Sequence, residues 1–210
     1  MSHQSVHDSR YCHKCGKANK ACICDSIVPI DTAVELIILQ HESEANHPLG
    51  SARILDLSLK NSILLVGEDF SRNQVLNDFL ADERYTHSIL YPSEQATTLL
   101  EYKHQSALNT KHRLILLDGT WKKAFKMWQL STNLHHLSCV ALPNDLKGEY
   151  QIRKAPSDNA LSTVEAGYYA LSALDPAADF SPLMTSFKQM IQFQIDQMPP
   201  GVFERNYLSN

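Results

Sequence analysis

The stretch from Arg113 to Trp128, RLILLDGTWKKAFKMW, constrains the fold more than any other part of the chain. Its apolar run, residues 114–117, ends abruptly at Asp118, which is typical of a strand buried on both faces of a parallel sheet. A helix is predicted next, because apolar residues recur at i, i+3, i+4 and i+7 and should face a core: Trp121, Ala124, Phe125 and Trp128. Asp118 is therefore expected where open α/β sheets bind ligands, at a strand's carboxyl end beside a helix N-terminus.

The opposite side of this predicted helix carries Lys122, Lys123 and Lys126 in its first two turns. Cations there oppose the helix macrodipole by roughly 0.3–1 kcal/mol each, and an anionic partner would convert this penalty into attraction. A simpler interpretation also stands: Asp118 or Thr120 caps the helix, and Trp121 belongs to the core.

Strand and helix patterns alternate along most of the chain. Apolar, β-rich runs predict further strands at 34–39, 63–66, 88–91 and 138–142, and helices are expected at about 71–80, 93–106, 162–174 and from 181 onward. This alternation predicts an α/β fold with a mostly parallel sheet and helices on both faces. A G-x-G-x-x-G segment is missing, which disfavours a Rossmann-type dinucleotide site.

Four of the five cysteines lie in one short segment, Cys12-x2-Cys15-x6-Cys22-x-Cys24. The first pair has zinc-knuckle spacing, and so small a segment needs metal coordination to fold, so we expect structural zinc there. His13 could replace one cysteine as a ligand. Cys139 instead falls in a predicted buried strand. The chain is thus divided into a tail and zinc knuckle, residues 1–30, and a main domain, residues 31–210.

Two loops and one helix start could face a ligand. Gly50 and Ser51 precede an amphipathic segment and could present backbone N–H groups to an anion, or could form an ordinary cap. The irregular connection from 143 to 156 carries Tyr150, Arg153 and Lys154, which suit base stacking and phosphate binding. Ser162-x-x-Glu165 is a capping-box pattern.

Composition limits the class of protein. The net charge of −4 gives no overall case for nucleic acid, so a basic site would have to be local. No apolar run approaches the length of a membrane span, and the polar start lacks the core of a signal peptide. We therefore expect a cytoplasmic protein without membrane contact. The sequence does not determine the oligomeric state, and a monomer is our expectation.

The block LLDGTW with its basic helix, together with LSTVEA at 161–166, resembles the DTW-domain family. The resemblance runs from about Tyr11 to about Leu174. It implies a SPOUT-like, possibly knotted domain that binds S-adenosylmethionine. It also implies transfer of the 3-amino-3-carboxypropyl group to N3 of a tRNA uridine, with release of 5′-methylthioadenosine. Two alternatives stay open: an RNA methyltransferase using the same cofactor, and a zinc-knuckle RNA-binding protein without catalysis.

The resemblance also implies roles for individual residues. Asp118 is the expected general base, because a carboxylate at this point could take the N3 proton. The expected cofactor-binding residues are Gly50, Ser51, Leu117, Asp118, Thr120, Trp121, Tyr150, Ser162 and Thr163. The expected RNA contacts are Arg53, Lys122, Lys123, Lys126, Arg153 and Lys154. The chain departs from the family pattern at Ser51, where relatives have threonine, and at Gly148, where they often have serine.

Overall fold

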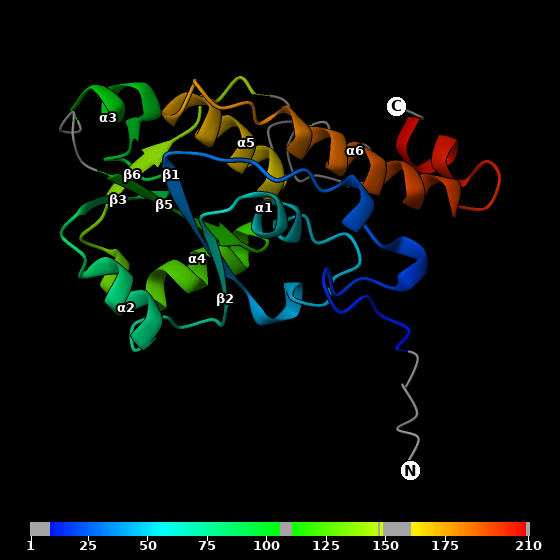
Figure 1. The fold of residues 1–210 in the computed structure, drawn as a ribbon, viewed down its shortest axis with the longest axis horizontal. Coiled ribbons are helices and arrows are strands. Elements are labelled where there is room, and N and C mark those ends of the chain that lie inside the picture. Colours follow the sequence, from blue (N-terminus) through cyan, green and yellow to red (C-terminus); the bar gives the residue numbers. More distant parts are fainter. Residues whose placement is uncertain (1–8, 106–110, 147, 149–160, 209–210) are drawn as a thin grey trace, which may run out of the picture.

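A parallel sheet of six strands forms the centre of the computed structural model, which describes residues 9–105, 111–146, 148 and 161–208 (Figure 1). Its strand order is β2-β1-β5-β3-β6-β4, and every neighbouring pair runs parallel. The strands are β1 (Val34–Gln40), β2 (Ser62–Val66), β3 (Tyr85–Leu90), β4 (Thr97–Thr98), β5 (Lys111–Asp118) and β6 (Ser138–Ala141). The predicted α/β fold with a parallel sheet is confirmed; whether the chain is knotted stays a prediction.

Helices cover both faces of the sheet because the central strands are apolar on both sides. In β1, Leu36 and Ile38 pack with α1, α3, α5 and α6, whereas Ile37 and Leu39 pack with α2 and α4. Figure 1 shows these two layers above and below the strands. The helices are α1 (Ala52–Ser58), α2 (Gln74–Leu80), α3 (Leu99–Gln105), α4 (Trp121–Leu130), α5 (Thr163–Leu174) and α6 (Ser181–Asp196). A π-helical turn, Glu204–Leu208, follows α6.

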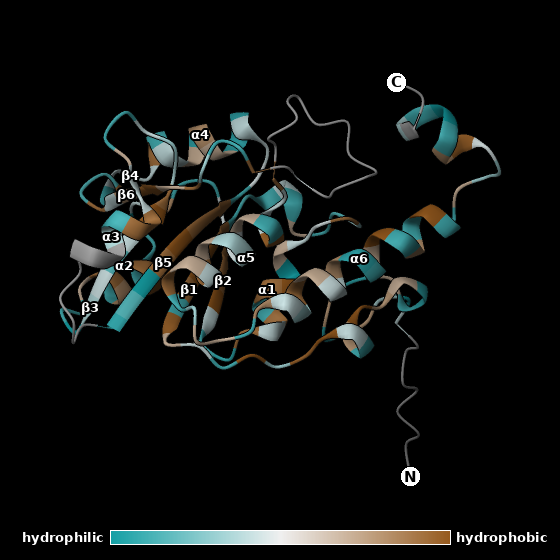
Figure 2. Cartoon of the chain, turned by 90° about the horizontal axis from the view of Figure 1, so that it is seen from above, coloured by the Kyte–Doolittle hydropathy of each residue, from teal (hydrophilic) through white to brown (hydrophobic). Residues whose placement is uncertain are grey.

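Strand β5 lies between β1 and β3 and forms the centre of the hydrophobic core. Leu114 and Ile115 are fully buried, on opposite faces of the sheet, and the strand is hydrophobic along most of its length in Figure 2. Its last residue, Asp118, pairs in register with Gln40 at the end of β1. The sheet therefore places both polar side chains at its carboxyl edge, as the sequence predicted for Asp118.

The predicted buried face of α4 is wrong in part. Ala124 and Met127 are buried, but Trp121 and Phe125 are 57% and 52% exposed. Trp128 is half-buried and stacks on Tyr91 with ring centroids 4.7 Å apart. The i, i+3, i+4 pattern identified a helix correctly. The face that meets the core is the one with Ala124 and Met127, and Trp121 and Phe125 lie outside it.

Two predicted helix starts are also wrong. The helix expected from Ser71 begins at Gln74, because the Asn73 side chain accepts the Leu76 N–H at 2.9 Å and caps it. The helix expected from Ser93 begins at Leu99, after the short strand β4, which pairs with β6. Asparagine is as strong a cap as serine, so the serine positions alone could not locate these boundaries.

The cysteine-rich segment packs into the main core. Cys15, Ile23 and Ile30 are 3–4% exposed and join the cluster formed with α1, α5 and α6. The Ser186 hydroxyl of α6 donates to the Ser26 carbonyl at 2.5 Å. The predicted division between residues 30 and 31 stays a prediction. In the described ranges, no helix combines the length and the apolar composition of a membrane span.

A buried histidine at the amino end of β5 makes stability depend on pH. His112 lies within hydrogen-bonding distance of Ser88 Oγ (3.0 Å), and burial lowers its pKa to about 4. The unfolded chain protonates this group near its ordinary value of 6.5. Below pH 6.5 the unfolded state binds a proton that the folded state does not, so stability falls as pH drops toward 4.

We predict that His112→Gln weakens this acid destabilisation by up to about 3 kcal/mol, because glutamine does not titrate. Urea denaturation at a series of pH values between about 7 and 4 measures the effect. The comparison uses the pH dependence of the unfolding free energy and not its absolute value. Identical pH dependence in the two proteins would contradict the assignment.

Candidate functional site

The carboxylate of Asp118 is the chemical centre of the carboxyl edge of the sheet. It is 6% exposed, and its Oδ2 accepts a hydrogen bond from Gln40 Nε2 at 2.8 Å. Its Oδ1 accepts the hydroxyl of Thr163, the first residue of α5, at 2.5 Å. A buried carboxylate requires such partners. Asp118 thereby joins β1, β5 and α5. The N-cap position of α4 is occupied by Thr120, whose side chain makes no capping bond.

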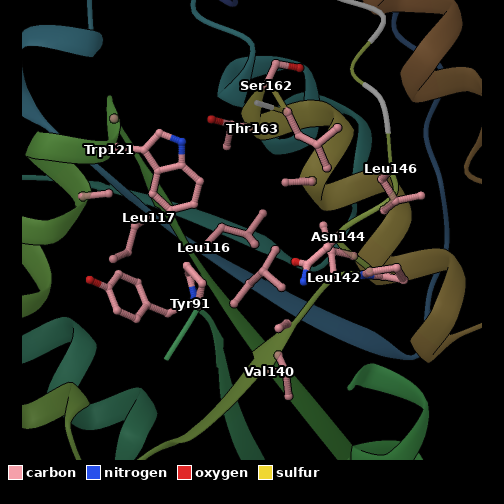
Figure 3. Close-up of a pocket in the computed structure, with 18 residues that line it drawn as sticks. Tyr91, Leu116, Leu117, Trp121, Val140, Leu142, Asn144, Leu146, Ser162 and Thr163 are labelled. Atoms are coloured by element: carbon pink, nitrogen blue, oxygen red, sulfur yellow. The ribbon is translucent and has the colours of Figure 1, made fainter. Parts of the chain in front are cut away.

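A cavity of about 230 Å³ opens beside this carboxylate, between α4 and α5 at the carboxyl ends of β3, β5 and β6. Figure 3 shows Trp121 and Tyr91 on one side, Leu142 and Leu146 on the other, and α5 beyond them. Its lining comprises Leu90, Tyr91, Pro92, Leu116, Leu117, Gly119, Trp121, Ala124, Val140, Ala141, Leu142, Pro143, Asn144, Leu146, Leu161, Ser162, Thr163 and Ala166. The walls are thus largely apolar, with a few hydroxyl and amide groups.

The predicted cofactor-binding residues fall into two sets. Leu117, Trp121, Ser162 and Thr163 line the cavity. Gly50, Ser51, Asp118 and Thr120 are outside the lining, although Asp118 reaches it through the Thr163 hydroxyl. The ninth predicted cofactor-binding residue, Tyr150, lies outside the described part of the chain, as do two of the expected RNA contacts, Arg153 and Lys154.

The N-terminus of α5 is held by two serines from different parts of the chain. Ser162 and Glu165 form the predicted capping box: Ser162 accepts the Glu165 N–H, and the Glu165 carboxylate accepts the Ser162 N–H at 2.7 Å. Ser51 Oγ accepts the Val164 N–H at 3.3 Å. Ser51 precedes α1 but makes no capping bond there. Its side chain therefore serves α5, which the sequence pattern could not reveal.

Two of the three lysines on α4 already have acidic partners. Lys123 pairs with Glu44 at 2.7 Å and Lys126 with Glu68 at 2.8 Å. Hydrogen bonds from Lys126 and His41 lower the pKa of Glu68. Both glutamates follow the carboxyl ends of neighbouring strands, β1 and β2, and the strand order of the sheet brings them to α4. Lys122 is exposed, and Arg53 pairs with Asp56 at 2.7 Å.

Trp121 and Phe125 form an exposed aromatic pair one helical turn apart, and Trp121 also lines the cavity. Residues four apart in an α-helix lie on the same face. Sequence reasoning assigned Phe125 to the core and so missed this surface. The helical periodicity does not reveal this aromatic surface, which is recognised only from the exposed fractions of Trp121 and Phe125 in the structure.

The four clustered cysteines come together in space. Sγ atoms are 3.7 Å apart in the pairs Cys12–Cys24 and Cys15–Cys22, and all four lie within 4.8 Å of one another. Zinc–sulfur bonds of about 2.3 Å give tetrahedral sulfur–sulfur distances of about 3.8 Å, so the geometry fits zinc. Within the described ranges this group consists of cysteines alone, and His13 is exposed outside it.

The thiols are electrostatically unequal in a way that suits a cation. Hydrogen bonds from the backbone N–H groups of Cys15 and Lys14 lower the pKa of Cys12 to about 6. Burial and the neighbouring sulfurs of Cys22 and Cys12 raise the pKa of Cys24 to about 12. The turn is completed by Gly16, whose φ of +72° favours glycine. A divalent cation would stabilise the further thiolates that this crowding disfavours.

Comparisons with known proteins identify the family of the chain. The DTW domain model matches residues 9–195. The chain is 30% identical to tRNA-uridine aminocarboxypropyltransferase 2 of Drosophila melanogaster over 88% of this chain and 75% of that protein. It is 28% identical to the Macaca fascicularis protein of the same name, over 78% of this chain but 56% of the relative. No solved structure matches. The chain belongs to the DTW domain family.

Proposed function

We propose that this protein transfers the 3-amino-3-carboxypropyl group from S-adenosylmethionine to N3 of a tRNA uridine and releases 5′-methylthioadenosine. The names of the relatives support the reaction. The chain spans 75% of the fly protein but 56% of the macaque and mouse proteins. The single observation that carries the assignment is the hydrogen bond from Thr163 Oγ1 to Asp118 Oδ1, at the wall of the cavity.

The cavity has the chemistry that a nucleoside cofactor needs. Its apolar walls, formed in part by Leu116, Leu142 and Trp121, suit the adenine ring, and Asn144 and Thr163 offer polar groups. The N-terminus of α5 suits the cofactor's carboxylate. The charge of Asp118, which lies behind Thr163, would attract the cofactor's ammonium through space without touching it. When bound, S-adenosylmethionine supplies a carbon next to sulfonium that is open to nucleophilic displacement.

The residues of this chain would then move one proton. Thr163 Oγ1 takes the proton of uridine N3 and passes its own proton to Asp118 Oδ1. Asp118 thus acts as the base through Thr163, because Thr163 lines the cavity and Asp118 lies behind it. Gln40, which donates to the other carboxylate oxygen, holds Asp118 in place. Deprotonation at N3 is what turns the uridine into a nucleophile.

The exposed surface of α4 is the proposed RNA contact. Lys122 is exposed and can approach a phosphate, and Trp121 and Phe125 offer ring faces for unpaired bases. Lys123 and Lys126 keep their place in this proposal, but each must share its charge with Glu44 or Glu68. Arg53 shares its charge with Asp56 in the same way, and Arg153 and Lys154 complete the proposed set.

We further propose that Cys12, Cys15, Cys22 and Cys24 hold a structural zinc ion, since their spacing fits a tetrahedron. None of the five cysteines forms a disulfide, in keeping with the reducing cytoplasm in which we place the protein. We also propose that it acts as a monomer.

The relay predicts that Asp118→Asn and Thr163→Val each lower the rate of aminocarboxypropyl-uridine formation by roughly 10²–10⁴. In Asp118→Asn the side-chain amide is far too weak a base to accept the proton that the Thr163 hydroxyl would pass on. Single-turnover kinetics at saturating cofactor measure the chemical step. Because both residues act as one unit, the double variant should be no slower than the slower single variant.

Thr163→Ser is the matched control, since it keeps the hydroxyl and should stay within a few-fold of the wild-type rate. Thermal midpoints of all variants establish that each is folded. A rate within a few-fold of wild type for folded Asp118→Asn or Thr163→Val would rule out the relay.

For the metal, we predict about one zinc per chain in freshly reduced protein. Cys12→Ser should lose it, because serine cannot supply a thiolate, whereas Cys139→Ser should retain it. Elemental analysis of the purified proteins measures the content, with Cys139→Ser as the matched control. Reduced wild-type protein without zinc would exclude the structural ion.

The contributions of charge and of base stacking to tRNA binding can be separated by the salt dependence of the affinity. Lys122→Gln should lower the slope of log affinity against log salt by up to about 0.9 for one lost phosphate contact. Phe125→Ala should weaken tRNA binding by roughly 1–3 kcal/mol with an unchanged slope. Lys123→Gln and Lys126→Gln should change the slope less than Lys122→Gln, since each frees a glutamate.

Lys60→Gln is the matched control, because Lys60 is exposed at the opposite, amino-terminal edge of the sheet. Filter-binding titrations at several salt concentrations measure all these variants beside the wild type. Wild-type affinity and slope in both Lys122→Gln and Phe125→Ala would place the RNA on another surface.

A further inference from the structure

Lys17 connects the cysteine cluster to the loop before α1. Its side chain is buried, 8% exposed, and its ammonium donates to the carbonyls of Pro48 (2.7 Å) and Gly50 (3.1 Å). The Lys17 carbonyl accepts the Cys12 N–H at 2.8 Å, so the same residue closes the turn that carries two of the cysteines. A buried ammonium is stable only with such acceptors, so the two carbonyls form a specific hydrogen-bonding site for the Lys17 side chain.

From Gly50, further contacts continue to the candidate site. The next residue, Ser51, is 5% exposed and accepts the Val164 N–H, at the first turn of α5. The neighbour of Val164 is Thr163, whose hydroxyl donates to Asp118. The path from the cysteine turn to the carboxylate therefore consists of hydrogen bonds and adjacent residues: Cys12, Lys17, Gly50, Ser51, Val164, Thr163 and Asp118.

The backbone of residues 47–50 packs closely on itself before it reaches Lys17. A Cβ atom at Gly50 would lie 3.1 Å from the His47 carbonyl oxygen, so the backbone passes very close to itself here. The Gly50 N–H donates to that same carbonyl at 2.9 Å. Leu49 of this loop packs against the same hydrophobic cluster as Cys15 and Ile23, so apolar contacts also hold the loop. Within the described residues, polar contacts between the cysteine turn and this loop are made by Lys17 with Pro48 and Gly50. The Lys17 side chain ties the loop to the cysteine cluster.

We propose that Lys17 is a positioning residue that couples the zinc-binding turn to the cofactor cavity by fixing the loop 48–51 and, through Ser51, the start of α5. The proposal has two parts. The coupling to S-adenosylmethionine binding rests on the proposed function, whereas the local part, that Lys17 fixes the loop 48–51, does not. Binding of zinc at the cysteines and of S-adenosylmethionine in the cavity should then favour each other, because coupling of two binding free energies is reciprocal.

The local part is tested by hydrogen exchange on Lys17→Met, which keeps the aliphatic stem and removes the donors. Exchange should rise by about tenfold or more at the amides of Gly50 and Val164, while amides in the middle of α6 keep wild-type rates. Lys14→Met is the matched control, because Lys14 is exposed on the same turn. A uniform rise throughout the chain would show general destabilisation and overturn the proposal, as would unchanged exchange at the two amides.

The coupling is tested with two ligands on zinc-loaded proteins that have equal zinc content. Calorimetry should find S-adenosylmethionine binding roughly 5- to 100-fold weaker in Lys17→Met than in wild type or Lys14→Met. In turnover, KM for the cofactor should rise while kcat stays within a few-fold. Reciprocally, saturating cofactor should slow transfer of zinc to a coloured chelator in wild type, and this protection should be lost in Lys17→Met.

The outcomes distinguish a failure of the proposed function from a failure of the role proposed for Lys17. If wild type fails to bind S-adenosylmethionine, the proposed function fails, and the exchange experiment still decides whether Lys17 fixes the loop. If wild type binds the cofactor and Lys17→Met binds it equally well, the coupling is wrong even if exchange increases.

Discussion

The carboxylate of Asp118 is the interaction on which the site depends, because it joins three elements that are distant in sequence. Gln40 comes from the end of β1 and Thr163 from the start of α5, and each donates to one oxygen of the carboxylate at the end of β5. The register of the parallel sheet places Gln40 beside Asp118, and the capping box sets the first turn of α5 against them. The cavity opens between α5 and α4, so its shape follows from these contacts.

A carboxylate in this position has a structural role and suits a chemical one. Burial alone would penalise its charge, and the two donors compensate for the lost water. One of those donors, Thr163, also borders the cavity, so in the proposed relay a proton would reach Asp118 without the carboxylate itself being exposed. Fixed, pre-oriented groups of this kind favour catalysis, because they need little rearrangement when charge develops.

The sequence predicts the framework of this arrangement well and its side-chain directions poorly. The apolar run before Asp118 and the Ser162–Glu165 pattern predicted the central strand, its carboxyl end and the start of α5, since these depend on local periodicity and capping. The helical periodicity assigned Trp121 and Phe125 to the core, because hydrophobicity alone does not say which side of α4 meets the sheet. Met127, less conspicuous than two aromatic rings, takes that place. The family resemblance, by contrast, placed Trp121 at the cofactor.

Long-range polar contacts were beyond sequence reasoning for a different reason. The bonds of Lys17 to the Gly50 loop, of Ser51 to α5, and of Lys123 and Lys126 to Glu44 and Glu68 join residues far apart in the chain. No spacing rule encodes such pairs; they follow from the strand order. Glu44 and Glu68 change the interpretation of the basic face most, because they neutralise charges that the sequence had assigned wholly to RNA.

The most direct measurement tests which group of S-adenosylmethionine is transferred, by labelling its methyl group and its aminobutyrate chain separately. Unmodified tRNA is incubated with the protein and S-adenosylmethionine that carries one isotope in its methyl group and another in its aminobutyrate chain, and the digested nucleosides are analysed by mass spectrometry. We predict a uridine that carries the aminobutyrate label and lacks the methyl label, with the methyl label recovered in 5′-methylthioadenosine. A nucleoside carrying only the methyl label, or tRNA without either label, would contradict the proposed transfer.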